Sequence, residues 1–277
     1  MPKRKKSFGN KIVLILILVL MSPFVYSLFV PDISRLKKEN PKKTSFMEYR
    51  EKEWKRDGKK YRIRQKWVPL SRVSPYLLKA VLIAEDDKFW SHEGFDYEAL
   101  QKALEKDIKA KKFKLGGSTI SQQLAKNLFL SPSKNPVRKI REAVLTWRIE
   151  RALSKKRILE LYVNVAEWGD RGIFGIENAA QHYYGKSASA LGPEEAARLA
   201  AVLPNPRKFN PLGDSSRYVV HRSNLIYNIM VRRGIVVPEY EEVIEEVETG
   251  GAEENAPAAP ETETPTLQES PDAPPIQ

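Results

Sequence analysis

The sequence contains no cysteine in its 277 residues, which excludes disulfide bonds, thiolate catalysis and cysteine-based metal sites. Residues 238–277 also lack lysine and arginine, although they hold 12 of the 35 acidic residues. The first 237 residues therefore carry all 47 basic residues against 23 acidic ones, a net charge of +24. A body this basic favours a polyanionic partner, such as nucleic acid, anionic lipid or a phosphorylated substrate.

Strand patterns are scarce, so the folded body, expected from 68 to 237, is predicted to be mostly α-helical. Residues 167–175 are rich in glycine and are predicted to form a loop. Residues 238–277 consist mainly of Glu, Pro, Ala and Thr without a core pattern, which predicts a disordered acidic tail. The expected helices cover residues 46–54, 76–85, 97–112, 176–184, 194–203 and 217–233, and others begin at 119, 136 and 155.

One long run without charge extends over 19 residues, from Ile12 to Val30. As a helix it reaches roughly 28 Å, about one hydrocarbon core. A cleaved signal peptide is the alternative, but the run is long for one and no small-residue cleavage site follows. We therefore predict a cytoplasmic basic N-terminus (1–11), a single transmembrane helix (12–30) and a membrane-proximal basic stalk (31–67). An anchor of this kind argues against nucleic acid as a partner.

The polar stretch from Gly116 to Asn127 opens a helix with its own start signal. Thr119 and Gln122 have the spacing of a capping box. Thr119, Gln123 and Lys126 or Asn127 then share one face, at a helix N-terminus that favours anions. The stretch is either an anion-binding element or a capped surface helix.

Glu85 ends a helix that is apolar almost all round and that starts at Ser74 as cap and Pro75 in the first turn. Burial and the negative end of the helix dipole both raise the pKa of such a carboxyl group. A raised pKa suits a general base that works near neutral pH. The alternative is a solvated turn after a core helix.

Glu142 is a third candidate site residue. Arg138 lies four residues before it and Lys139 three residues before it, so all three share one helix face. On its own, this spacing predicts an ordinary solvated ion-pair face.

Taken together, these stretches resemble the peptidoglycan glycosyltransferases of family 51, over about Val68 to Arg233. Nothing after Arg233 could form the transpeptidase domain of two-domain members, so the resemblance is to the monofunctional ones. Ser121 replaces the usual Thr, and the 168–175 loop is one residue longer than usual, which leaves the role of Arg171 open. The shared motifs are Glu85-Asp86-x-x-Phe89-x-x-His92-x-Gly94, Gly116 to Asn127, Arg138-Lys139-x-x-Glu142, Ile158-Leu159-Glu160-x-Tyr162-x-Asn164, and Gly175 to Lys186.

The resemblance implies a lysozyme-like helical fold and transfer of a lipid-diphosphate-linked glycan to the 4-hydroxyl of the next lipid II, with inversion. It makes Glu85 the general base and Glu142 the second functional carboxylate, on the donor side. Asp86 and Phe89 would shape the site around the base. The residues implied to hold sugar and diphosphate are Ser118, Thr119, Gln123, Lys126, Asn127, Arg138 and Lys139.

The implied partners are lipid II, the growing glycan-lipid diphosphate, the membrane and other cell-wall synthesis proteins. The implied location is the bacterial inner (cytoplasmic) membrane, with the catalytic domain on the periplasmic side. The resemblance implies no required cofactor. It allows Mg²⁺ or Mn²⁺ at the diphosphate, with Asp86 and Asp87 as candidate ligands. No acidic cluster in the sequence indicates a dedicated metal site.

Two other functions stay open. A lysozyme-like hydrolase or lytic transglycosylase would use one catalytic Glu in a similar fold, and a non-catalytic scaffold would only bind lipid II. The cations Lys126, Arg138 and Lys139 favour a diphosphate donor, because cutting neutral glycan has no obvious use for them.

Overall fold

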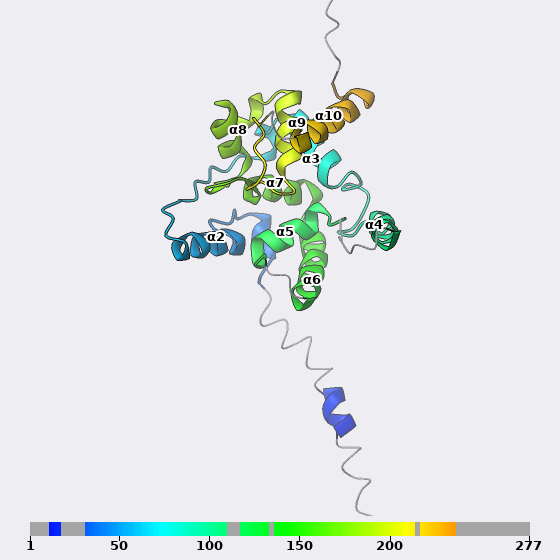
Figure 1. Ribbon diagram of the computed structural model, residues 1–277. Coiled ribbons are helices and arrows are strands. Elements are labelled where there is room, and N and C mark those ends of the chain that lie inside the picture. Colours follow the sequence, from blue (N-terminus) through cyan, green and yellow to red (C-terminus); the bar gives the residue numbers. More distant parts are fainter. Residues whose placement is uncertain (1–10, 18–30, 110–116, 133–135, 214–216, 237–277) are drawn as a thin grey trace, which may run out of the picture. The chain divides into compact units, whose positions relative to one another are not determined.

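The computed structural model describes residues 11–17, 31–109, 117–132, 136–213 and 217–236. These residues are mostly helical, as the sequence predicts (Figure 1). The α-helices of the body are α2 (Ser45–Arg56), α3 (Pro75–Glu85), α4 (Tyr97–Lys109), α5 (Ile120–Phe129), α6 (Pro136–Ala152), α7 (Lys155–Val165), α8 (Ile176–Tyr184), α9 (Pro193–Val202) and α10 (Arg217–Arg232). Short 3-10 helices cover Ser34–Lys37, Leu70–Arg72 and Ala188–Ala190, and the strands are β1 (Glu167–Gly169) and β2 (Ile173–Phe174).

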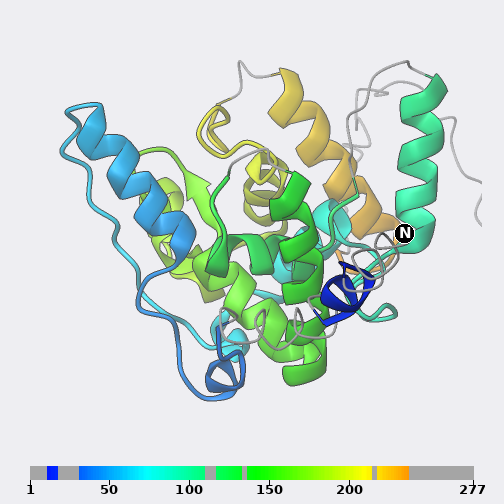
Figure 2. The same ribbon diagram turned by 90° about the horizontal axis from the view of Figure 1, so that it is seen from below.

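Two groups of helices share one hydrophobic core. Helix α3 packs against α9 and α10, while α5 packs against α6 and α7 (Figure 2). Helix α7 lies between the two groups, and seven of its eleven residues are buried, including Ile158 and Tyr162. A helix buried on nearly all sides can hold polar side chains from both groups in fixed positions.

The predicted helix starts at Thr119 and Ser74 are correct in position, but only Thr119 caps its helix with its side chain. Thr119 accepts a hydrogen bond from the Gln122 amide nitrogen, and the Gln122 side chain accepts one from the Thr119 amide nitrogen, which confirms the capping box. Ser74 does not cap α3 with its side chain. Its hydroxyl donates instead to the Leu191 carbonyl at 2.7 Å and so ties the start of α3 to the chain before α9.

Residues 31–67 pack against the body, contrary to their prediction as a stalk. Ile33 and Leu36 are buried in the main core, and Met47 and Trp54 form a second small cluster with Phe174. The basic composition of this segment conceals these few buried residues, because they are too widely spaced to give a pattern. That the segment lies near a membrane stays a prediction.

The predicted loop at 167–175 contains a short antiparallel hairpin. Glu167 pairs with Phe174, and the register is irregular before Gly169. Its turn holds Arg171 at φ 60° and Gly172 at φ 90°. A Cβ atom on Gly172 would lie 2.9 Å from the carbonyl oxygen of Arg62, so this glycine is required. Strands of two and three residues are too short to show the alternation by which a strand is predicted.

Residues 11–17 are helical, and the apolar side chains of 12–17 are exposed. Within the described ranges, no helix has the length and apolar character needed to cross a membrane. Residues 18–30 of the predicted span, Gly116 and the predicted tail lie outside these ranges. The anchor and the tail therefore stay predictions.

Candidate active site

Glu85 is the last residue of α3, and its side chain is only 11% exposed. Gln123, in the first turns of α5, donates a hydrogen bond from Nε2 to Glu85 Oε2 at 2.8 Å. Burial raises the pKa of Glu85, and the nearby Gln123, Arg222 and Lys126 only partly offset it. The raised pKa predicted from the sequence is therefore confirmed, with burial as its main cause.

Tyr162, from the buried helix α7, fixes the direction of the Gln123 amide. Its hydroxyl donates to Gln123 Oε1 at 3.0 Å, so the amide nitrogen must face Glu85. Tyr162 is fully buried, which raises its pKa well above the ordinary value and keeps the phenol a hydrogen-bond donor. The sequence places Tyr162 in a shared motif but gives no sign of this contact.

Arg222 is a site residue that sequence reasoning missed. It reaches from α10 and donates to the Ala84 carbonyl at 2.9 Å and to Glu85 Oε1 at 3.3 Å. Its Nε is buried and finds no hydrogen-bond partner in the described part of the chain. No local pattern could have indicated it, because 137 residues separate it from Glu85.

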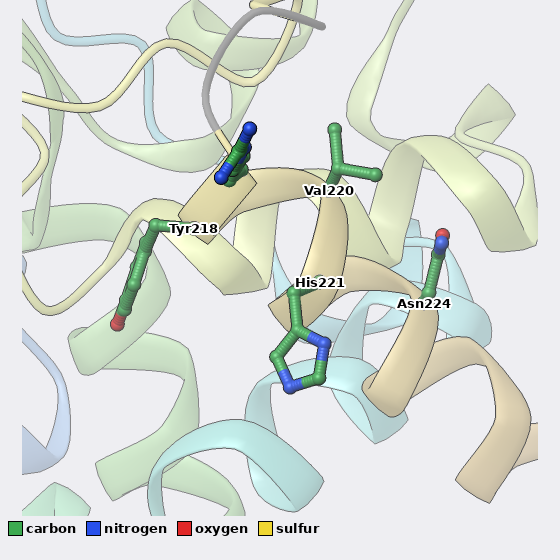
Figure 3. Close-up of a pocket in the computed structure, with 5 residues that line it drawn as sticks. Tyr218, Val220, His221 and Asn224 are labelled. Atoms are coloured by element: carbon green, nitrogen blue, oxygen red, sulfur yellow. The ribbon is translucent and has the colours of Figure 1, made fainter.

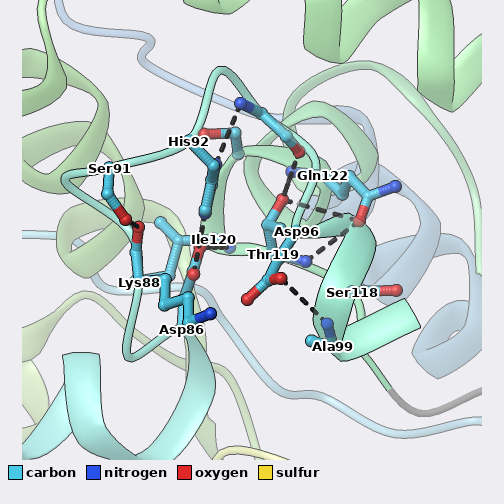
Figure 4. A network of polar contacts seen from close by, with 12 residues as sticks. Asp86, Lys88, Ser91, His92, Asp96, Ala99, Ser118, Thr119, Ile120 and Gln122 are labelled. Atoms are coloured by element: carbon cyan, nitrogen blue, oxygen red, sulfur yellow. Dashed lines mark hydrogen bonds and ion pairs between the residues drawn. The ribbon is translucent and has the colours of Figure 1, made fainter. Parts of the chain in front are cut away.

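Asp86 joins the loop after α3 to the start of α5 (Figure 4). Its Oδ2 accepts from the Ile120 amide nitrogen at 2.9 Å, and its Oδ1 lies 2.8 Å from His92 Nε2. The Gly94 amide nitrogen donates to His92 Nδ1, so the ring proton is on Nε2 and is donated to Asp86. This arrangement supports the predicted role of Asp86 in shaping the site, because it sets α5 opposite Glu85.

Glu142, on α6, is buried at 3% exposure, so the solvated ion-pair face considered from the sequence is wrong. It pairs with Arg138 at 2.6 Å and with Lys139, and Lys139 Nζ also lies 3.4 Å from Ser118 Oγ. The structure thus brings Ser118, Arg138, Lys139 and Glu142 together. The buried Nε of Arg138 has no hydrogen-bond partner among the described residues.

Lys126 connects the two carboxylates electrostatically. Burial lowers its pKa, Arg138 and Lys139 lower it further, and Glu142 and Glu85 partly restore it. All four charged groups therefore lie within electrostatic reach of one ammonium group. A partly buried cation near two carboxylates suits a substrate that carries a negative charge of its own.

The other predicted residues lie around this centre. Gln123, Lys126 and Asn127 line one cavity of about 180 Å³. Phe89 is fully buried and supports the loop after α3 from within the core. The ammonium of Lys155 lies 4.6 Å from the centroid of its ring. Thr119 is 2% exposed, and its hydroxyl donates to the Gly94 carbonyl at 2.7 Å, which ties the start of α5 to the loop after α3.

The described residues do not form a dedicated metal site. Both oxygens of Asp86 are engaged, and Asp87 pairs with Arg233 through two bonds of 2.6 and 2.8 Å. The described ranges contain no group of three or more His, Asp or Glu side chains placed to hold a metal. No step of the reaction is therefore assigned to a metal ion.

A larger hollow of about 690 Å³ lies on α10 and is lined by Tyr218, Val220, His221 and Asn224 together with Arg217 (Figure 3). None of the predicted site residues lines it. We place the active site at Glu85, where buried charged groups converge, because volume alone provides no chemistry.

Comparisons with known proteins identify the family of this chain. A family model described as Transglycosylase matches residues 52–231. The "Biosynthetic peptidoglycan transglycosylase" of Dechloromonas aromatica (strain RCB) is 54% identical over 171 residues, 62% of this chain and 74% of that protein. Proteins of the same name from Methylobacillus flagellatus and Janthinobacterium sp. (strain Marseille) are 47% and 45% identical over 206 and 227 residues. These alignments span 74% and 82% of this chain, and 88% and 96% of the relatives. The chain therefore belongs to the transglycosylase family, which confirms the family predicted from its motifs.

Proposed function

We propose that this protein polymerises lipid II: it transfers the lipid-diphosphate-linked glycan to the 4-hydroxyl of the next lipid II, with inversion. The protein is a peptidoglycan glycosyltransferase by its family and its relatives. The observation that carries the mechanism is a buried carboxylate of raised pKa beside a cluster of cations. The helical body would have a lysozyme-like fold.

Glu85 is the general base in this mechanism. Its carboxylate takes the proton of the acceptor 4-hydroxyl as that oxygen attacks the anomeric carbon of the donor. Gln123 and Arg222 hold the carboxylate in place, and Tyr162 holds Gln123.

The cations act on the leaving group. As the bond from the anomeric carbon to the phosphate oxygen breaks, the diphosphate leaves with the electron pair and gains charge. Lys126, Arg138 and Lys139 stabilise that charge, and Ser118 contributes a hydroxyl donor beside Lys139. Glu142 keeps Arg138 and Lys139 oriented on the donor side.

Purified full-length protein incubated with lipid II in detergent tests this function. We expect glycan polymer whose new bonds have the opposite anomeric configuration to the donor, because the transfer inverts the anomeric carbon. Unchanged lipid II would favour the scaffold. Cleavage of preformed glycan without consumption of lipid II would favour the hydrolase or lytic transglycosylase.

The proposal includes a single-pass anchor in the bacterial inner membrane at residues 12–30, with the catalytic domain on the periplasmic side. Removal of residues 1–31 should leave activity in detergent but lower it on liposomes that contain lipid II, because the anchor raises the local enzyme concentration at the membrane. Equal activity of the shortened and full-length proteins on liposomes at matched concentration would contradict the anchor's role.

A further inference from the structure

A second hollow, which we call the hairpin groove, lies beside the β1–β2 hairpin and has a volume of about 790 Å³. Three segments form it: residues 60–64, the hairpin with α8, and residues 206–210. Among the described residues that line it, Asp170 is the only acidic one. The cations of its lining are Lys60, Arg62, Arg64, Arg171, Arg207 and Lys208.

The hairpin groove also contains aromatic rings and amides. Tyr61 lies under the guanidinium of Arg171, at 5.9 Å from the ring centroid. Phe209 is stacked on Tyr218 with ring centroids 4.3 Å apart, which fixes the orientation of its ring. Asn178 donates to the carbonyl oxygens of Arg64 and Phe174 and so holds two walls of the groove together.

The hairpin groove adjoins the active site at Pro206 and Arg207. Both residues also line the 180 Å³ cavity that contains Gln123 and Lys126. Arg207 is held by Glu53 at 3.0 Å and by Asp170 at 3.6 Å. A chain that leaves the cation cluster through this cavity would therefore reach the hairpin groove next.

We infer that the hairpin groove binds the growing glycan strand through its peptide-bearing disaccharide units. The inference rests on the proposed function. Apolar faces of sugars pack on aromatic rings, hydroxyls bond to amides, and the carboxylates of the attached peptides pair with arginine. The acidic residues 238–277 could satisfy the cations by charge alone but would leave the rings and amides unused.

Strand length tests this inference, because a strand held at the groove stays on the enzyme for the next addition. The variant combines Lys60→Gln, Arg62→Gln and Lys208→Gln, whose side chains are exposed. Affinity differences at one interface lie mostly in the dissociation rate. The variant should therefore release its strand sooner and make strands that are several times shorter. The initial rate at which two lipid II molecules are joined should be unchanged.

The matched control combines Lys52→Gln, Lys79→Gln and Lys156→Gln, which remove the same charge from exposed positions outside the groove lining. The control should make strands of wild-type length. If the wild-type protein makes no polymer at all, the proposed function fails. If polymer forms and groove variant, control and wild type make strands of equal length, only the groove inference fails.

A binding measurement separates the strand from other occupants. Soluble glycan oligomers are titrated into the full-length protein, with their peptides intact or removed by amidase. The groove variant should bind the peptide-bearing oligomers about ten-fold more weakly at low salt, since exposed ion pairs contribute modestly each. Oligomers without peptides should show a smaller difference. If oligomer affinity is unchanged and the variant only abolishes cross-linking of residues 238–277 to the groove, the occupant is the acidic tail and the inference is overturned.

Discussion

Glu85→Gln should lower the rate of lipid II polymerisation by about 10²–10⁴, because the amide cannot accept the proton of the acceptor hydroxyl. The substitution keeps the volume of the side chain and can still accept the hydrogen bond from Gln123. Lipid II binding and thermal stability should therefore stay close to wild type. Initial rates, a binding isotherm and a melting curve provide the three measurements. Glu48→Gln, at an exposed position on α2, is the control and should be fully active.

A Glu85→Gln protein that polymerises lipid II near the wild-type rate would show that Glu85 is not the base. It would not favour the scaffold, because polymer would still be made. Only a wild-type protein that binds lipid II and makes no polymer supports that alternative.

The pH profile of the wild type gives an independent measure of the same group. The base must be ionised, so activity should rise as pH increases through the raised pKa of Glu85. The midpoint of this rising limb of the pH profile should lie above the ordinary carboxyl pKa of 4.5. Arg222→Gln removes a cation that lowers this pKa, so it should move the limb to still higher pH. Arg232→Gln, exposed on the same helix, should leave the limb in place.

Lys126→Met should lower kcat by about 10²–10³, equivalent to about 2.7–4 kcal/mol of barrier, because the leaving diphosphate loses a buried cation. Methionine keeps an unbranched apolar chain, so folding should be preserved, which a melting curve checks. In the wild type, Lys126 must be protonated, so activity should fall with rising pH through a pKa below the ordinary 10.5. Lys156→Met, exposed on α7, is the control. A loss of less than about three-fold in Lys126→Met would remove Lys126 from the mechanism, since donors of this kind contribute far more.

Features set by neighbouring residues could be predicted from the sequence. The capping box at Thr119, the Glu142 ion pairs and the burial of Glu85 each depend on spacings of one or two helical turns. Helix positions are predicted for the same reason, since apolar periodicity is local.

Features set by distant contacts could not be predicted. Arg222 reaches Glu85 and Arg50 reaches Glu167 across more than 100 residues, and nothing beside either arginine indicates its partner. The packing of residues 31–67 was missed because it depends on single residues such as Ile33 and Trp54. The buried state of Glu142 follows from helix packing, which an ion-pair spacing alone does not reveal.

The Nε atoms of Arg138 and Arg222 are both buried, and neither has a hydrogen-bond partner among the described residues. One sits beside Glu142 and the other beside Glu85. A buried donor left without any partner costs about 1–3 kcal/mol, so each nitrogen favours an acceptor placed beside it. We therefore expect a substrate that offers an oxygen to each nitrogen to gain affinity from two further hydrogen bonds.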